Sequence, residues 1–305
     1  MKTSKLILVF LFTVMLVSAQ TIGVRSRVEL KTSSGTVKAY HPVFNLAGDK
    51  VLFTSDNYSG LSMFDINSQA VTQISSEAGA GYEPLFNNND TKIFYRKTSY
   101  VEGRKMDAIE SYETTNGKKM QMLAPQRDLR NASNFHNGFL VTANKRLLKS
   151  TFGKTDKTVS VYVTTQEMQI HLYKNGKFTI INPLNVSDAR YIWVSLSPGS
   201  DKILFTAAGK GTFVCDLNGK LVSTLGYLNA PVWYDNNYVV GMQDKDDGHV
   251  VTSSKIVMVS LNGKVKSEIS AKGEIAMYPT ASAKVAKIAY NTIDGKVMIA
   301  DLDIK

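Results

Sequence analysis

The sequence predicts an all-β protein, a six-bladed β-propeller closed by pairing of its first and last strands. Three observations lead to this fold. Short apolar segments are rich in Val, Ile, Phe and Tyr, a unit of roughly 40 to 50 residues recurs along the chain, and Asn-Gly pairs separate apolar segments. Asn-Gly between apolar strands indicates tight hairpins, because both turn positions need positive φ.

Each repeated unit starts with a short apolar strand, followed by a polar turn with Asp or Asn and a second apolar strand. The clearest copies begin at His41, Glu83, Val194, Ala230 and Tyr278, and a degenerate sixth copy is expected at residues 133–141. Units continue with a third strand and a polar turn, as at residues 256–264. Such units with about four strands each are propeller blades, and a ring of them leaves only short, protected edges.

The ends of the chain are expected to close the ring. The last unit supplies only its third strand, at residues 297–302. Its fourth strand is expected between Gln20 and Ser33, where Val24, Val28 and Leu30 indicate a strand. Residues 20–305 are therefore predicted to form a single propeller domain.

Residues 1–19 have the layout of a secretory signal peptide. Lys2 and Lys5 precede an apolar run, and Val17 and Ala19 stand at the minus-three and minus-one positions of a cut before Gln20. A membrane anchor is the alternative, but the run is shorter than the ~20 apolar residues that a spanning helix needs. We therefore expect an exported protein with no transmembrane segment in its mature chain.

Charge and cysteine content limit the partners and the forces that hold the fold. The chain has 36 Lys and Arg against 26 Asp and Glu, a net charge of +10. This surplus favours an anionic partner such as an acidic glycan, lipid head groups or an acidic protein. The sequence contains no dense block of Lys and Arg, so we do not expect specific nucleic-acid binding. Cys215 is the single cysteine, so no internal disulfide is possible, and we expect it in the core.

Residues 196–205, with Ser197-Pro198 followed by Asp201-Lys202 and an apolar strand, resemble the WD-repeat-like propeller repeat of the TolB family. The sequence departs from that repeat by carrying Gly-Ser-Asp where the family has Asp-Gly. The resemblance implies a six-bladed ring whose funnel mouths bind proteins, peptides or glycans. It also implies a periplasmic or secreted protein of a Gram-negative bacterium, which we expect to be a monomer.

The sequence predicts no catalytic residue, metal site or cofactor. His41, His136, His171 and His249 lie in four separate stretches without metal-ligand spacing, and no Gly-x-Ser-x-Gly elbow is present. Residues 244–248 resemble the start of a calcium loop, but their glycine comes one position early. A hairpin turn is the better interpretation.

The starts of the innermost strands are the best candidate site. If these strands are aligned on their prolines, the preceding residues converge at one opening and form a collar. This collar contains Tyr40, His41, Tyr82, Glu83, Arg130, Trp193 and Tyr278. Large aromatic side chains at an exposed concavity are typical binding anchors, although they would equally serve to fill the upper channel.

We therefore predict a non-enzymatic scaffold that binds a protein or a cell-envelope component, such as a glycan or another anionic partner, through one funnel mouth. The alternative is a propeller enzyme that acts on a glycan or a lactone. Such an enzyme needs a cluster of carboxylates or a metal set inside the channel. Three or more inward Asp, Glu, Asn or His side chains within coordination reach would favour it.

Overall fold

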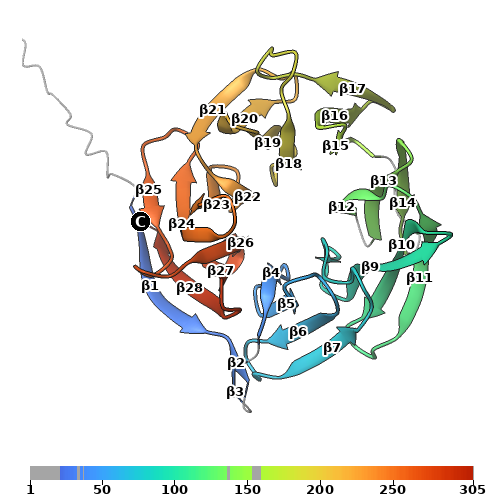
Figure 1. The fold of residues 1–305 in the computed structure, drawn as a ribbon, viewed down its shortest axis with the longest axis horizontal. Coiled ribbons are helices and arrows are strands. Elements are labelled where there is room, and N and C mark those ends of the chain that lie inside the picture. The colour runs from blue at the N-terminus through green and yellow to red at the C-terminus, as the bar shows by residue number, and fades with distance from the viewer. Residues whose placement is uncertain (1–20, 33–34, 37, 136–137, 153–158, 305) are drawn as a thin grey trace, which may run out of the picture.

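The computed structural model describes residues 21–32, 35–36, 38–135, 138–152 and 159–304. The described chain forms a β-propeller of seven blades around a central channel (Figure 1). The all-β propeller prediction is confirmed, and the predicted count of six blades is wrong. No helix in these ranges is long and apolar enough to span a membrane.

Five blades have four antiparallel strands each, and blades 3 and 4 have three within the described residues. Blade 1 contains β4 (Tyr40–Phe44), β5 (Lys50–Thr54), β6 (Leu61–Asp65) and β7 (Val71–Ser75), and blade 2 contains β8 (Leu85–Phe86), β9 (Lys92–Val101), β10 (Arg104–Glu113) and β11 (Lys119–Gln126). Blade 3 contains β12 (Arg130–Phe135), β13 (Gly138–Ala143) and β14 (Arg146–Ser150), and blade 4 contains β15 (Val161–Gln166), β16 (Gln169–Lys174) and β17 (Lys177–Ile181).

Blade 5 contains β18 (Tyr191–Leu196), β19 (Lys202–Ala207), β20 (Gly211–Asp216) and β21 (Leu221–Gly226), and blade 6 contains β22 (Asn229–Trp233), β23 (Tyr238–Asp246), β24 (Val251–Ser260) and β25 (Lys266–Glu268). Blade 7 contains β26 (Ala276–Ser282), β27 (Lys287–Thr292), β28 (Val297–Ile304) and, from the start of the chain, β1 (Ile22–Glu29). A small hairpin, β2 (Lys31–Thr32) and β3 (Gly35–Thr36), follows β1.

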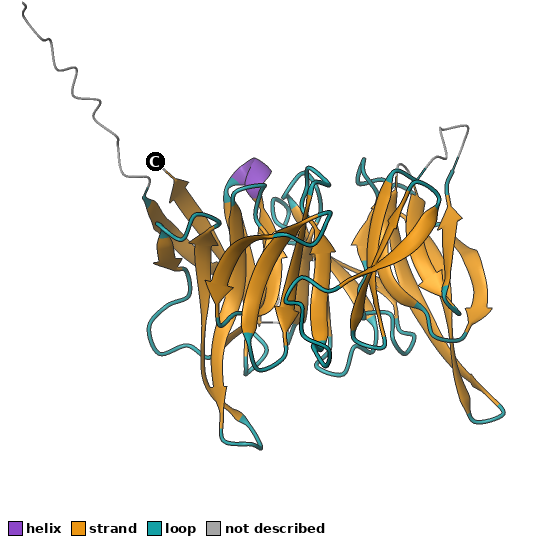
Figure 2. Ribbon diagram, turned by 90° about the horizontal axis from the view of Figure 1, so that it is seen from above, coloured by secondary structure: helices purple, strands orange, loops and turns teal. Residues whose placement is uncertain are grey.

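The innermost strands β4, β8, β12, β18, β22 and β26 all begin at one opening, which we call the entry mouth. Their hairpins lie at the opposite opening, the turn mouth, where the Asp90 carboxylate of blade 2 accepts the Leu46 N–H of blade 1 at 2.9 Å. Figure 2 shows the short helix η1 (Ala283–Val285), between β26 and β27, on this side of the ring and long hairpins on the other side.

Blade 4 differs from the other six in its first described strand. The turn that ends β15 lies at the entry mouth, because Tyr191 at the start of β18 donates its N–H to the Met168 carbonyl at 2.7 Å. In the same turn Glu167 pairs at 3.2 Å with Lys145, which lies in the turn from β13 to β14. Therefore β15 runs toward the entry mouth, as the second strands of the other blades do.

This direction explains the wrong blade count. The repeat motif marks innermost strands, and the described chain contains six of them. Blade 4 has no such strand among its described residues, so it carries no motif copy. The expected degenerate copy at residues 133–141 corresponds to β12 and β13 of blade 3, with residues 136–137 outside the described ranges. The Asn175-Gly176 turn between β16 and β17 was the remaining signal of blade 4.

The predicted closure of the ring is confirmed. Strand β1 pairs antiparallel with β28, from Ile22 opposite Ile304 to Glu29 opposite Met298. The core lies between the faces of neighbouring blades, where Ile170 and Leu172 of blade 4 meet Phe205 and Cys215 of blade 5. Cys215 is fully buried, as predicted, and burial raises the pKa of its thiol to about 12.

Deletion of residues 20–33 should lower the melting temperature strongly and cause aggregation, because it exposes the outer edge of β28 and the apolar surface beneath β1. Thermal melting and light scattering measure both effects. Two substitutions on β1 compare a buried with an exposed side chain of the closing strand. Ile22→Asp places a charge at a position that is 8% exposed, whereas Val28→Asp places it at one that is 59% exposed. Only the first should destabilise, and a deletion variant that melts like the parent would show that closure does not depend on β1.

Candidate functional site

Six innermost strands enter the ring through the same backbone irregularity. One residue near each entry has a φ between 43° and 51°, and five of these strands show a register shift at this point. The six residues are His41, Glu83, Asn131, Trp193, Ala230 and Tyr278. Left-handed φ values are uncommon for residues other than glycine, and a bulge of this kind re-aims a side chain. Four of the seven predicted site residues are therefore placed by one repeated bulge.

An aromatic cluster connects blades 7, 1 and 2 at the entry mouth. The His41 ring lies 4.2 Å from the Tyr58 ring and 4.3 Å from the Tyr278 ring, measured between centroids. Tyr58 in turn meets the Tyr82 ring edge-on at 5.3 Å. Aromatic pairs at these separations stabilise one another, so the cluster is held in a defined arrangement. The sequence predicted His41, Tyr82 and Tyr278 here, and it missed Tyr58.

Burial keeps the centre of this cluster uncharged. Burial lowers the pKa of the His41 imidazole to about 4, against an ordinary value of 6.5. Burial likewise raises the pKa of the Tyr58 hydroxyl to about 12. At neutral pH the cluster therefore presents aromatic rings and a neutral imidazole.

Glu83 is held by a buried arginine that the sequence analysis missed. Arg96, 2% exposed, donates from Nη2 to the Glu83 carboxylate at 2.7 Å and from Nη1 to the Leu129 carbonyl at 2.8 Å. Its guanidinium carbon lies 5.0 Å from the centre of the Tyr82 ring, and Asp107 supplies a second carboxylate at 3.6 Å. A buried charge needs such compensation. In the sequence, the position of Arg96 directly after the apolar stretch of β9 was the only indication that this charged side chain is buried.

Arg130 and Trp193 lie across the mouth from the aromatic cluster. Both line a cavity of about 540 Å³ that Tyr82, Glu83 and Arg96 also border. The Arg130 Nε donates to the Asp128 carboxylate at 2.6 Å, so this guanidinium is half-exposed but already paired. The structure thus brings Tyr82, Glu83, Arg130 and Trp193 to one cavity.

Tyr40 has a different environment from the other predicted residues. Its half-buried ring packs on Gly295 in the turn from β27 to β28, where an added Cβ would lie 2.7 Å from the ring. Tyr40 therefore fills the junction between blades 1 and 7 instead of joining the aromatic cluster.

The exposed aromatic side chains of the described chain lie on the entry side of the ring, and two of them, Tyr82 and Trp193, line the cavity at the mouth itself. Those at least 40% exposed are Tyr82 (43%), Tyr100 (71%), Trp193 (40%) and Tyr227 (51%). Tyr100 lies at the end of β9 and Tyr227 in the connection from β21 to β22, so all four belong to this side of the ring. The turn mouth instead exposes the aliphatic Leu46 and Val285.

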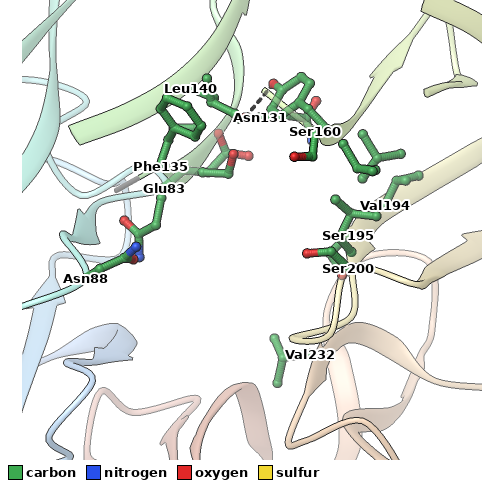
Figure 3. Close-up of a pocket in the computed structure, with 17 residues that line it drawn as sticks. Glu83, Asn88, Asn131, Phe135, Leu140, Ser160, Val194, Ser195, Ser200 and Val232 are labelled. Atoms are coloured by element: carbon green, nitrogen blue, oxygen red, sulfur yellow. Dashed lines mark hydrogen bonds between the residues drawn. The ribbon is translucent and has the colours of Figure 1, made fainter. Parts of the chain in front are cut away.

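The channel below the mouth contains a cavity of about 850 Å³ (Figure 3). Its polar lining includes Glu83, Asn88, Asn131 and Asn134, which reaches the number of inward polar side chains expected of the enzyme alternative, but Glu83 is bound to Arg96 and Asn131 to Thr164. No group of three His, Cys, Asp or Glu residues in the described ranges is arranged to hold a metal ion. Residues 244–248 form the end of β23 and its hairpin turn, as predicted.

The search of solved structures found β-propellers of low sequence identity. The β-propeller domain of Cps50 (Swd1) from Myceliophteria thermophila is 11% identical, covers 90% of this chain and 99% of its own, and has a TM-score of 0.55. Oligogalacturonate lyase from Vibrio parahaemolyticus is 8% identical, with coverages of 93% and 98% and a TM-score of 0.52.

TolB from Acinetobacter baumannii is 14% identical, with a TM-score of 0.50, and its match covers 79% of this chain but 56% of TolB. No protein-family model matches the sequence, and the search of curated proteins found no match. These likenesses show the β-propeller fold.

The neutral state of His41 predicts a pH dependence of stability. Because its pKa is about 4 in the folded protein and about 6.5 when unfolded, its contribution is complete above pH 6.5 and decreases as the pH falls toward 4. A His41→Phe variant keeps a stacked ring without the titrating group. The melting temperature of the wild type should therefore fall more steeply than that of the variant between pH 7 and 4.5. Parallel curves would contradict a buried, neutral imidazole.

Proposed function

We propose that this chain is an exported, non-enzymatic scaffold that binds a protein through its entry mouth. The observation that carries the proposal is the gathering of Tyr82, Tyr100, Trp193 and Tyr227 on that side. Tyrosine, tryptophan and arginine dominate the binding energy of protein interfaces when they are presented on rigid supports. Here the bulge at Trp193, and the contacts of Tyr82 with Tyr58 and Arg96, provide that rigidity for the two aromatic residues at the mouth.

The channel chemistry supports binding over catalysis. An enzyme acting on a glycan or lactone needs carboxylates or a metal set free to act on the substrate. Among the described residues that line the 850 Å³ cavity, Glu83 supplies the carboxylate. This carboxylate instead accepts a hydrogen bond from Arg96 at 2.7 Å. The likeness to an oligogalacturonate lyase is one of fold alone, at 8% identity.

The location and the nature of the partner belong to the same proposal. Residues 1–19, which lie outside the described ranges, carry the signal-peptide pattern, so we place the mature protein in the periplasm or outside a Gram-negative cell. Without Lys2 and Lys5 of the signal peptide, the mature chain has a net charge of +8, which favours an acidic protein, with an anionic envelope glycan as the alternative ligand. Residues 20–305 then act as a single, monomeric domain.

Truncation of the exposed anchors tests the binding face. Tyr82→Ala and Trp193→Ala should each weaken binding of the partner captured from the native envelope by about 1 to 4 kcal/mol, measured by calorimetry. The melting temperature of Trp193→Ala should change little, since this side chain is 40% exposed. Tyr82→Ala also removes ring contacts to Tyr58 and Arg96, so a lower melting temperature is expected for it.

The matched control is Leu46→Ala, which truncates a 58% exposed side chain at the turn mouth. It should leave the affinity unchanged. Loss of binding in the control together with normal binding in the two aromatic variants would move the interface to the turn mouth and overturn the proposal.

A further inference from the structure

The 850 Å³ cavity lies beside blade 4, which has no innermost strand among its described residues. In the other six blades that strand separates the rest of the blade from the channel. In the described part of blade 4, β15 is the first strand, and Ser160, Val161 and Val163 line the cavity directly. Figure 3 shows this opening with β12 residues on one side and Val194 and Ser195 of β18 on the other.

The channel-facing edge of β15 carries unpaired backbone groups. Glu167 and Met168, with φ of 51° and 59°, form a two-residue hairpin that sets Gln166 opposite Gln169. Antiparallel pairs alternate, so the N–H and C=O groups of Val161, Val163 and Thr165 point away from β16. Thr165 confirms this direction, because its N–H donates to the Asn131 side chain at 3.2 Å.

Asn131 occupies only the entry end of this edge. Its side-chain oxygen accepts from Thr165 N–H and from the Thr164 hydroxyl at 2.7 Å. The outward groups of Val161 and Val163 have no hydrogen-bond partner in the described protein, although Val163 is only 6% exposed. Buried backbone groups are nearly always paired. The edge is therefore incomplete in the same way as a sheet that has lost a strand.

The lining defines what would fit there. The lining combines apolar side chains such as Leu140, Val194 and Leu196 with small uncharged polar ones such as Ser133 and Ser195. The cavity's one charged lining residue in the described chain is Glu83, which Arg96 neutralises. An occupant of this space loses its contact with water, and burying an unpaired charge is costly. The buried part of the occupant must therefore be uncharged.

We infer that β15 accepts an extended segment of the protein partner, which enters through the entry mouth and adds to blade 4 as its innermost strand. This inference rests on the proposed function and specifies its binding mode, strand addition. The inserted segment spans five or six residues, as β4 and β18 do, with small apolar side chains at alternate positions and no charge at its centre.

The test uses a synthetic probe, acetyl-Thr-Val-Thr-Val-Thr-Val-amide, titrated into the isotope-labelled protein and followed by NMR. Val163→Pro removes the outward N–H and leaves the bonds to β16 intact, because proline is tolerated where a strand N–H faces away from its sheet. Val163→Ala is the control for lost side-chain volume. We expect the proline variant to bind the probe about tenfold more weakly than the alanine variant.

A second probe keeps the test independent of the folding of the variant. N-methylation of alternate amides in the peptide should also weaken its binding to the wild type about tenfold, because it blocks strand pairing. Equal binding of both probes, or no binding at millimolar concentration, would overturn the inference. Protection of the Val163 amide from exchange in the free protein would also overturn it, since the chain itself or a second copy then fills the edge.

These outcomes are separable from failure of the proposed function. The probe reports on β15, whereas the anchor variants report on the rim of the mouth. If the Tyr82 and Trp193 variants lose partner binding and the peptide probe does not bind the wild type, the entry mouth remains the proposed binding face and strand addition to β15 is rejected.

Discussion

The antiparallel pairing of β1 with β28 is the interaction on which the rest of the molecule depends. It joins the two ends of the chain and turns a row of separate sheets into a ring. The closed ring places Tyr278 of the last blade 4.3 Å from His41 of the first, although 237 residues separate them in sequence. The aromatic cluster of the entry mouth therefore forms across the closing junction, and it exists only if the ring is closed.

The site was predictable to the extent that it depends on the repeat. A proline marks the entry of four innermost strands, β4, β8, β22 and β26, and alignment of the repeated units extends the pattern to β18, so the repeat assigns His41, Glu83, Trp193 and Tyr278 to one opening. Tyr58 and Arg96 were not predictable in this way, because a loop and a second strand bring them to the mouth through the ring geometry. Tyr40 begins the innermost strand β4, as the repeat predicts, and its ring packs beside Gly295 in the junction between blades 1 and 7.

The blade count shows the limit of motif counting. The six motif copies correspond to six innermost strands. Blade 4 has no motif copy, because its described part begins with β15, which runs in the direction of the second strands of the other blades. Within the described chain, the same feature leaves the channel-facing backbone groups of Val161 and Val163 without a partner. The place where the sequence pattern failed is therefore where the structure offers a strand edge, next to a mouth that carries exposed aromatic anchors.

Photo-crosslinking in the native cell tests most directly whether a partner occupies the entry mouth. A photoreactive phenylalanine derivative replaces Tyr100 or Tyr227 on the entry side of the ring, or Leu46 or Val285 at the turn mouth, all of them exposed positions. Our account predicts a common protein adduct from the first pair and none from the second. Adducts only from the turn-mouth positions would contradict it.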